Sequence, residues 1–416
     1  MQHVMVIGGG VVGLTTAWSL LEAGFEVSVV EREAELAQGA SRANGGQLSY
    51  RFVSPLADSG VPPKALRWLF EPDSPLRFKP EWSLHQWKWL AAFLGNCRAS
   101  VNQQTTQRLL ALGAFSQTAF SELYTHAQLQ GVALRTPGKL VIYRSPAEFA
   151  AVATRLRGDS KNIEKLLSYQ ECLSLEPALT HSPVQLAGGV FTAGEAVADC
   201  YALSLQLAER LRVHARFKGF VHAQAQGFVI RDGKTVALRT DVGEMDADAF
   251  VIAAGLQSRA LALTAGISLP IYPLKGYSLT APIGTAHKPP VVSVTDIEKK
   301  ILYAQIGSTL RVAAMADLVG EDTRIDPARM ASLYRSVNAT FPQAANYEAS
   351  EEWAGLRPAT PSGAPILGAT PVSGLWLNVG HGALGFTMSF GAARIVSELI
   401  AGRKSPLSLD GLQLRA

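Results

Sequence analysis

The chain opens with a strand, a glycine-rich turn, a helix and a second strand, and this order restricts the fold more than any other feature. Residues 4–7 form an apolar run too short for a buried helix, and residues 11–23 carry apolar side chains at helical spacing. Gly24 ends the predicted helix, and residues 27–30 form a second apolar run. Two strands joined by a crossover helix are typical of an α/β protein.

The turn between the first strand and the helix has the spacing of a nucleotide-binding site. Gly8, Gly10 and Gly13 form G-x-G-x-x-G, which permits a tight turn, close approach of backbone to a pyrophosphate and close helix–strand packing. The helix N-terminus offers N–H groups and a partial positive charge to phosphates. Glu31 follows the second strand, where it can accept hydrogen bonds from ribose hydroxyls. This unit leaves NAD and FAD open, and its predicted nucleotide-binding residues are Gly8, Gly10, Val11, Val12, Gly13, Glu31 and Arg32.

Composition describes a globular chain and excludes several functions. The 416 residues are 48% hydrophobic and 17% charged, which is enough for two or three domains. With 38 basic and 34 acidic residues, the net charge of +4 gives no indication of nucleic-acid binding. The cysteines are far apart and favour a reducing cytoplasm without a disulfide framework or a metal site. We expect no signal peptide, and no window reaches the roughly 18 uninterrupted apolar residues of a spanning helix.

The segment that follows the first unit favours FAD over NAD. Residues 41–47 read Ser-Arg-Ala-Asn-Gly-Gly-Gln, and an NAD dehydrogenase has no obvious use for such a segment. FAD is longer, so its riboflavin half must be covered by small polar residues that let the backbone approach closely. An ordinary surface loop is the alternative. The candidate contacts to the pyrophosphate and ribityl region are Ser41, Asn44, Gly45, Gly46 and Gln47.

A second strand, glycine turn and helix occurs near the C-terminus. Residues 375–379 lead into Gly-His-Gly-Ala-Leu-Gly at 380–385, and a helix is predicted over 387–401. The positive end of this helix dipole would stabilise the charge of a reduced flavin by about 0.3–1 kcal/mol. Residues 247–254 are predicted to be a strand of the same nucleotide-binding sheet. Further cofactor contacts are therefore expected from Val221, Ala254, Gly255, Gly380, His381, Gly382, Leu384, Gly385 and Thr387, with His381 acting through its backbone.

The middle of the chain predicts a second domain. Short alternating stretches indicate a mostly antiparallel sheet at residues 271–279, 291–295, 301–305 and 310–315. Helices are predicted at 105–124, 201–211 and 329–341, and a strand at 138–143 with a turn at Ser145. The predicted fold is α/β, a Rossmann-like FAD-binding domain of the glutathione-reductase type with an interleaved α+β substrate domain. The predicted parts are 1–54, 187–262 and 353–416 for FAD, and 55–186 and 263–352 for the substrate.

Two stretches, residues 64–70 and 74–93, mix tryptophan with basic residues. Tryptophan and lysine suit the surface of a membrane, so peripheral contact with a membrane is one interpretation. Helices packed on the domain core are the other interpretation, since tryptophan is common in cores. The predicted location is the cytoplasm, and the first interpretation adds peripheral contact with the cytoplasmic face of the inner membrane.

The sequence resembles the FAD-dependent D-amino acid dehydrogenases of bacteria, within the wider D-amino-acid oxidase and glycine oxidase superfamily. The resemblance covers nearly the whole chain and rests on Gly8-Gly-Gly-Val-Val-Gly13, Ser41-Arg-Ala-Asn-Gly-Gly-Gln47, Pro62-Pro-Lys-Ala-Leu-Arg-Trp68, Tyr272-Pro-Leu-Lys-Gly-Tyr-Ser-Leu279, Trp353-Ala-Gly-Leu-Arg-Pro358, Thr360-Pro-Ser-Gly363 and Gly380-His-Gly-Ala-Leu-Gly385. It implies non-covalent FAD and oxidative deamination of a D-amino acid to a 2-oxo acid and ammonia. It also implies hydride transfer from Cα to the flavin and electron transfer to a quinone or another electron-transfer acceptor.

The resemblance assigns Arg357 to the substrate carboxylate, and a guanidinium fork suits bidentate carboxylate binding. A structural salt bridge is the alternative for Arg357. Tyr277 and Tyr50 are candidates to bond the carboxylate or to close the pocket, although core aromatics would look the same in sequence. Lys275 could approach the flavin or end a strand. Tyr50 and residues 299–305 depart from the family pattern near predicted substrate-facing strands, so the substrate is left open.

Two further functional interpretations are retained. An oxidase would use O₂ as acceptor with a D-amino acid, glycine or an imino acid as substrate. A non-catalytic FAD-binding subunit of an electron-transfer complex would need no substrate at all.

Overall fold

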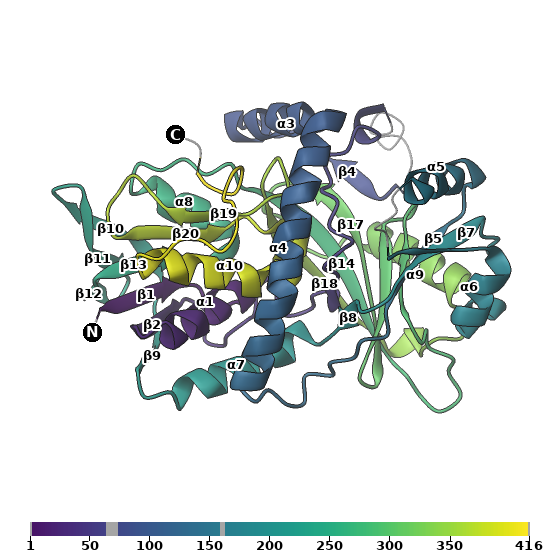
Figure 1. Ribbon diagram of the computed structural model, residues 1–416, viewed down its shortest axis with the longest axis horizontal. Coiled ribbons are helices and arrows are strands. Elements are labelled where there is room, and N and C mark those ends of the chain that lie inside the picture. The colour runs from purple at the N-terminus through teal and green to yellow at the C-terminus, as the bar shows by residue number, and fades with distance from the viewer. Residues whose placement is uncertain (1, 64–73, 159–162, 415–416) are drawn as a thin grey trace.

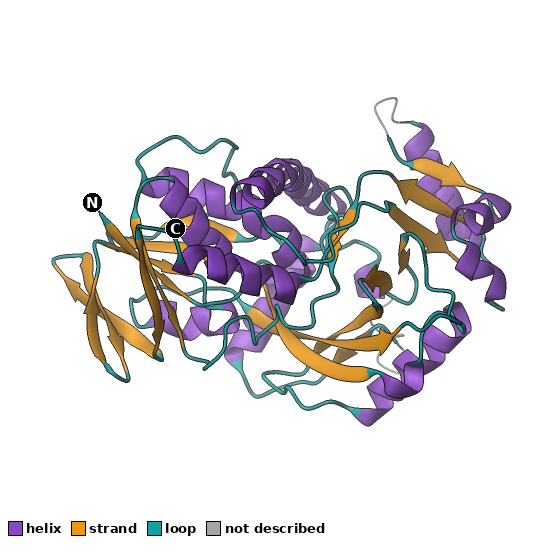
Figure 2. Cartoon of the chain, turned by 90° about the horizontal axis from the view of Figure 1, so that it is seen from below, coloured by secondary structure: helices purple, strands orange, loops and turns teal. Residues whose placement is uncertain are grey.

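The computed structural model describes residues 2–63, 74–158 and 163–414, and its strands form two large sheets. One sheet has six strands and the other nine, with a three-stranded and a two-stranded sheet beside them. In Figure 1 the six-stranded sheet lies on the left, the nine-stranded sheet on the right, and the long helix α4 (Ala99–His126) crosses between them. Figure 2 shows from below that helices pack along the six-stranded sheet and that the other sheet is curved.

The six-stranded sheet has β1 at its centre, and every neighbouring pair is parallel except β19–β20. In spatial order its strands are β19 (Ile366–Ala369), β20 (Leu375–Val379), β13 (Ala249–Ile252), β1 (His3–Ile7), β2 (Glu26–Glu31) and β9 (Phe217–His222). Consecutive residues of β1 are buried on both faces, which explains the unbroken apolar run in the sequence. The predicted strands at 4–7, 27–30, 247–254 and 375–379 are confirmed.

Helices cover this sheet through their apolar faces. α1 (Val11–Glu22) packs against α10 (Gly385–Ile400) and α7 (Cys200–Arg212), and α10 also packs against α4. Residues 382–400 are long and apolar enough to cross a membrane by length and composition alone, yet 61% of that stretch is buried inside the protein. Its place between α1 and α4 is that of a core helix.

The nine-stranded sheet is mostly antiparallel, as predicted, with parallel pairing only at β15–β5 and β17–β4. In spatial order its strands are β18 (Glu351–Ala359), β14 (Tyr272–Pro282), β17 (Thr309–Leu318), β16 (Ile301–Ile306), β15 (Ser293–Asp296), β5 (Lys139–Tyr143), β7 (Gly188–Thr192) and β6 (Lys165–Leu167), with β4 (Leu76–Phe78) beside β17. Helix α9 (Pro327–Thr340) belongs to the same core through Met330, Leu333 and Val337.

Two strands differ from the predicted domain boundaries. The predicted FAD-binding parts 187–262 and 353–416 include β7 and most of β18, yet both strands pair in the nine-stranded sheet. Both strands pair with segments distant in sequence, and local pattern carries no signal for the sheet that a strand joins.

The remaining elements connect the two sheets or extend them. They are β3 (Gln47–Leu48) with β8 (Ala196–Val197), the β10–β11–β12 sheet (Ala225–Arg231, Lys234–Thr240, Gly243–Asp246), and α3 (Leu84–Asn96), α5 (Pro146–Arg157), α6 (Tyr169–Leu175) and α8 (Ser258–Leu263). The predicted turn at Ser145 is wrong, because Ser145 caps α5 and accepts from the Glu148 N–H with proline in the first helical turn.

Candidate active site

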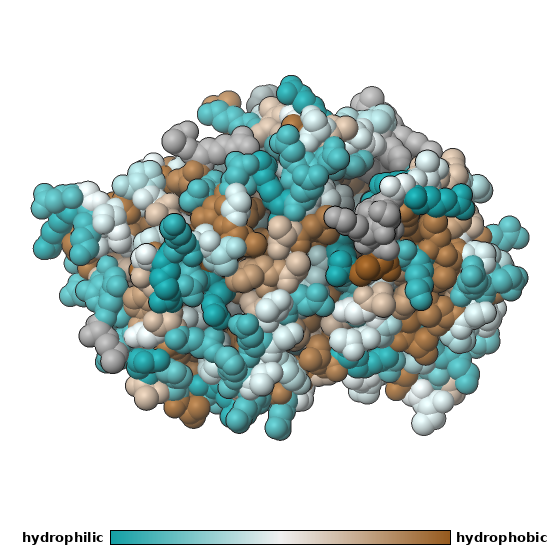
Figure 3. Space-filling view, viewed as in Figure 1, coloured by the Kyte–Doolittle hydropathy of each residue, from teal (hydrophilic) through white to brown (hydrophobic). Residues whose placement is uncertain are grey.

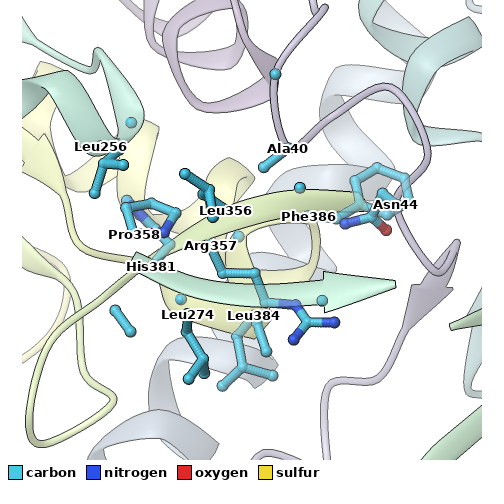
Figure 4. A pocket seen from close by; sticks show the side chains of 18 of the residues that line it. Ala40, Asn44, Leu256, Leu274, Leu356, Arg357, Pro358, His381, Leu384 and Phe386 are labelled. Atoms are coloured by element: carbon cyan, nitrogen blue, oxygen red, sulfur yellow. The ribbon is translucent and has the colours of Figure 1, made fainter. Parts of the chain in front are cut away.

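A cavity of about 1800 Å³ runs from the glycine-rich turn after β1 to the nine-stranded sheet. Its wall combines that turn, the segment 37–47, strands β14, β17 and β18, the β15–β16 turn, and residues 380–387. Figure 4 shows Arg357, Leu274 and Leu356 from the nine-stranded sheet facing the same space as Ala40, Asn44 and Leu384. Residues from three distant parts of the sequence therefore form one site.

The glycine-rich turn at the nucleotide end of this cavity is packed too closely against neighbouring backbone to hold side chains at Gly8 and Gly13. Gly8 has φ +116°, and a Cβ there would lie 2.5 Å from the Ala253 carbonyl oxygen. A Cβ at Gly13 would lie 1.8 Å from the Gly8 carbonyl oxygen. Glu31 lies at the end of β2, and its carboxylate accepts the Gly9 N–H at 2.6 Å. The residues present fit a dinucleotide: Gly8 and Gly10 line the cavity where α1 begins, without side chains between the backbone and a pyrophosphate, and Glu31 lines it where a ribose would lie.

Helix α1 begins without a side-chain cap on its Gly10 N-cap and without an acidic residue in its first turn. Ser41 Oγ instead accepts the Val11 N–H at 3.0 Å, so the segment 41–47 is fastened to the start of this helix. A helix N-terminus without an acidic residue favours a phosphate, because the dipole charge is not neutralised.

The segment 44–47 lies against the nine-stranded sheet. Arg311 donates to the Asn44 carbonyl oxygen at 2.6 Å, and a Cβ on Gly45 would lie 2.8 Å from Leu302. The Gln47 amide donates to Ser293 Oγ. The segment is therefore a lining of the cavity, and its two glycines are required by close contact with this sheet.

Most of the predicted site residues line this one cavity. They are Gly8, Gly10, Val11, Val12, Glu31, Arg32, Ser41, Asn44, Gly45, Gln47, Ala254, Gly255, Tyr277, Arg357, Gly380, His381, Gly382, Leu384, Gly385 and Thr387.

Four predicted site residues lie outside the cavity wall. Gly13 packs helix α1 against the Gly8 backbone, and Gly46, at φ +72°, faces Ile306. Val221 lies in β9 and pairs with Val30 of β2, so it is one strand away from the nucleotide end. Tyr50 is 2% exposed within the core of the six-stranded half, and burial raises its pKa. The prediction that Tyr50 closes the pocket is wrong, since its side chain faces the core.

Arg357 lies on the cavity wall without a carboxylate partner among the described residues. Its Nη1 donates to the Met315 carbonyl oxygen at 2.8 Å. Asp317, the nearby acid, is engaged by both Nε and Nη2 of Arg329 at 3.1 and 2.6 Å. Burial lowers the pKa of Arg357, and the Asp317 charge opposes this shift. The salt-bridge alternative for Arg357 is therefore not what the structure contains.

The local geometry of β14 and β18 makes room for the Arg357 side chain. Gly276 lies opposite Gly355 across the two strands, two pairs along from Leu274 and Arg357 and therefore on the same face. A Cβ on Gly276 would lie 2.2 Å from Nη2 of Arg357. The guanidinium therefore rests on a bare backbone, and in Figure 4 it extends away from Pro358 and His381.

His381 is 3% exposed at the end of β20, where it pairs with Ala359 of β18. Its Nε2 has no hydrogen-bond partner among the described residues. Burial lowers the pKa of its imidazole to about 4, so the ring is neutral at pH 7. α10 begins directly after this turn without a side-chain cap.

Three further residues that were not predicted from the sequence also line the cavity: Lys139, Ser49 and Phe52. Lys139 begins the strand Lys-Leu-Val-Ile-Tyr, and a lysine in an otherwise apolar buried strand was the signal available. Lys275, in contrast, does not line the cavity: it is 2% exposed and its ammonium donates to the Arg324 carbonyl oxygen.

Comparison with known proteins gives one consistent result. A family model described as FAD dependent oxidoreductase matches residues 3–399. D-amino acid dehydrogenase 2 of Pseudomonas aeruginosa is 45% identical over 412 residues, covering 99% of this chain and 98% of that protein. A D-amino acid dehydrogenase of Paramagnetospirillum magneticum is 39% identical, covering 99% and 98%.

Solved structures agree on the fold. Glycine oxidase from Geobacillus kaustophilus superposes with a TM-score of 0.77 at 20% identity, covering 100% of this chain and 99% of that one. L-Proline dehydrogenase from P. horikoshii gives 0.76 at 16% identity, covering 99% and 96%. The predicted fold class is thereby confirmed. The chain belongs to the family of FAD-dependent oxidoreductases, and its nucleotide end is an FAD site.

Proposed function

We propose that the protein is an FAD-dependent D-amino acid dehydrogenase, which converts a D-amino acid to a 2-oxo acid and ammonia. The observation that carries this proposal is Arg357, a partly buried guanidinium on the cavity wall that has no carboxylate partner among the described residues. A carboxylate is the ligand that such a guanidinium binds best. The near full-length similarity to two D-amino acid dehydrogenases supports this substrate class.

In the proposed mechanism, the chain's own residues position the substrate. Arg357 binds the α-carboxylate, and Leu274, Met315 and Trp353 line the wall around it. Bound FAD supplies the two-electron acceptor for the hydride at Cα. The apolar wall excludes water, and fixing the carboxylate orients the Cα–H bond without a strong side-chain base. Tyr277 also lines this wall, although its ring packs in the core of the nine-stranded sheet, and its phenol is proposed as a second contact to the substrate.

FAD is proposed to be bound without a covalent link. The three cysteines are all free and buried, and none of them lines the cavity. Acid precipitation of the protein should therefore release all of the flavin into the supernatant, whereas yellow precipitate would contradict this proposal.

The electron acceptor is proposed to be a quinone or another electron-transfer acceptor rather than O₂. The surface of α3 supports this choice, because a quinone acceptor requires contact with a membrane. Trp82, Leu84 and Trp87 are exposed, next to exposed lysines at 79 and 88, while Trp89 and Phe93 face the core. The aromatic stretch 74–93 is thus half core and half surface, and the stretch 64–70 lies outside the described residues.

We accordingly propose a cytoplasmic protein that contacts the inner membrane through α3. On the face seen in Figure 3, hydrophobic surface forms separate patches among hydrophilic ones. Substrate-dependent reduction of a dye or quinone, with little peroxide formed, is the expected result. Abundant peroxide at full turnover would instead favour the oxidase.

The central test is anaerobic mixing with a panel of D- and L-amino acids while flavin absorbance is followed. Bleaching by D-amino acids is expected. Bleaching by L-amino acids alone would overturn the substrate class, and no bleaching by any amino acid would favour a non-catalytic FAD-binding subunit.

A further inference from the structure

An apolar face of the nine-stranded sheet lies beside Arg357 and lines the same cavity. Leu274 of β14 pairs directly with Arg357 of β18, so the two side chains are neighbours on one face of the sheet. On this face the Arg357 guanidinium lies over the backbone of Gly276 and donates to the Met315 carbonyl oxygen of β17. The place where a substrate carboxylate would bind is therefore next to Leu274, which lines the cavity as well.

Helix α3 covers this face with two aromatic side chains. Trp89 donates its indole N–H to the Ala359 carbonyl oxygen at 3.0 Å, and Ala359 is two residues, or about 7 Å, along β18 from Arg357. The ring of Phe93 stacks on Trp89 with 5.3 Å between the ring centroids. Both aromatic residues line the cavity and belong to the same hydrophobic cluster as Leu274. The side chain of an amino acid whose carboxylate is held at Arg357 can therefore contact them.

The rest of this hydrophobic cluster extends the same surface. Leu76 of β4 pairs with Ala316 of β17, and Leu76 and Val61 both line the cavity. Asp58 also lines the cavity, but it is exposed, and its carboxylate accepts a backbone N–H within its own loop. An apolar wall beside Arg357 is thus formed by Leu274, Leu76, Val61, Trp89 and Phe93. None of these five side chains is charged, so a charged group buried against them would lose its hydration without gaining a partner.

We propose that this apolar wall binds the side chain of the substrate and selects D-amino acids whose side chain is large and apolar, such as D-leucine and D-phenylalanine. The inference rests on the proposed function and narrows its substrate class. Burial of a large apolar side chain against the wall contributes binding that the single methyl group of D-alanine cannot supply. Arg357 holds the α-carboxylate in both cases, so the difference between substrates comes from the wall.

The wild-type enzyme gives the first test. The kcat/KM for D-leucine and D-phenylalanine is expected to exceed that for D-alanine by about 10- to 100-fold, the range that several buried methylene groups supply. The values for D-glutamate and D-lysine should lie below that for D-alanine, because their charges would be buried unpaired. A value for D-alanine, D-glutamate or D-lysine that equals or exceeds that for D-leucine overturns the inference. In that case a D-amino acid still bleaches the flavin and the proposed function stands. If no D-amino acid bleaches it, the proposed function has failed.

A substitution assigns the preference to the wall. Leu274→Ala removes the side chain opposite Arg357, so the ratio of kcat/KM for D-leucine to kcat/KM for D-alanine should fall by about 10-fold. Leu279→Ala is the matched control, because Leu279 is also buried in β14 but belongs to a separate hydrophobic cluster outside the cavity wall. The control should keep the wild-type ratio. An unchanged or higher ratio in Leu274→Ala overturns the inference, and retained yellow colour and thermal unfolding show that both variants are folded.

A binding measurement on the wild-type holoenzyme is independent of turnover and of the folding of any variant. Hydrocinnamate and propanoate are the carboxylates that correspond to D-phenylalanine and D-alanine without the amine. Hydrocinnamate should shift the flavin spectrum at about 10-fold lower concentration than propanoate, because only its ring reaches the apolar wall. Succinate, which carries a second carboxylate, should bind no more tightly than propanoate. Equal dissociation constants for hydrocinnamate and propanoate, or tighter binding of succinate than of hydrocinnamate, would overturn the inference.

Discussion

The nucleotide end of the cavity is built from backbone, and the substrate end is built from long side chains that rest on backbone. Directly behind the first end, a Cβ on Gly13 of α1 would meet the carbonyl oxygen of the cavity-lining Gly8 at 1.8 Å. At the second, a Cβ on Gly276 would meet the tip of Arg357 at 2.2 Å. The two contacts are similarly short, but the first neighbour cannot move and the second can. The nucleotide end should therefore fail by losing the cofactor, and the substrate end by losing only chemistry.

The largest effect is expected for Gly13→Ala. The added methyl meets rigid backbone, so α1 must shift from β1, at a cost of about 3 kcal/mol in the free energy of unfolding. The cofactor content after purification and the thermal unfolding temperature should both fall. Gly95→Ala in α3 is the control, because nothing lies within 4 Å of its Cβ and helical alanine is favoured. Normal FAD content in Gly13→Ala would contradict the claim that changes at the nucleotide end cause loss of the cofactor.

Arg357→Leu should leave the protein yellow and folded but lower kcat/KM by about 10²- to 10⁴-fold, the worth of two hydrogen bonds to a charged group. Arg357→Lys should recover part of this loss, since the charge remains without the fork. Steady-state kinetics with a D-amino acid measure the effect, and Arg231→Leu in the β10–β11 hairpin serves as an exposed control. Activity of Arg357→Leu within threefold of wild type would remove Arg357 from the substrate site.

The contrast between the two ends also explains what the sequence could predict. The nucleotide end is local: strand, turn, helix and Glu31 lie within the first thirty-one residues, and their spacing fixes their geometry. The role of Arg357 could be predicted only from the family resemblance and not from spacing. Its neighbours Gly276 and Met315 are brought to it by the pairing of β14, β17 and β18.

Tyr50 and Lys139 show where prediction failed. Tyr50 lies two residues after β3, and nothing local shows whether a side chain there meets the cavity or the core, so the sequence puts Tyr50 at the site although its side chain lies in the core. Lys139 was passed over, because nothing local shows that β5 pairs with β15 and so brings the lysine beside Gln47. For the same reason, the sequence does not show that β7 and β18, in segments predicted to bind FAD, pair in the nine-stranded sheet.

The pH dependence of the unfolding free energy tests the place where the two ends of the cavity meet, at the pairing of His381 with Ala359. Burial lowers the pKa of His381 to about 4 from 6.5, so the unfolded chain takes up a proton before the folded protein does. Stability is therefore present above pH 6.5 and is lost as pH falls from 6.5 to 4, by up to about 3 kcal/mol. His381→Asn should flatten this part of the curve of unfolding free energy against pH, whereas exposed His181→Asn should not. A curve equally steep in His381→Asn would show that other groups cause the loss.

The smallest effect, and the sharpest form of the comparison, is expected for Gly276→Ala. The three atoms nearest to the added methyl all belong to the tip of the flexible Arg357 side chain, which can rotate away, so the free energy of unfolding should change by less than about 1 kcal/mol. FAD content should be normal, in contrast to Gly13→Ala. The displaced Arg357 guanidinium would no longer be aligned with the substrate carboxylate. The value of kcat/KM should therefore fall by about 10-fold, mainly because KM rises. If Gly276→Ala instead lost FAD, a change at the substrate end would affect cofactor binding, and the two ends of the cavity would not be independent. If its kinetics matched the wild type, Arg357 would not need the bare backbone of Gly276 to reach the substrate.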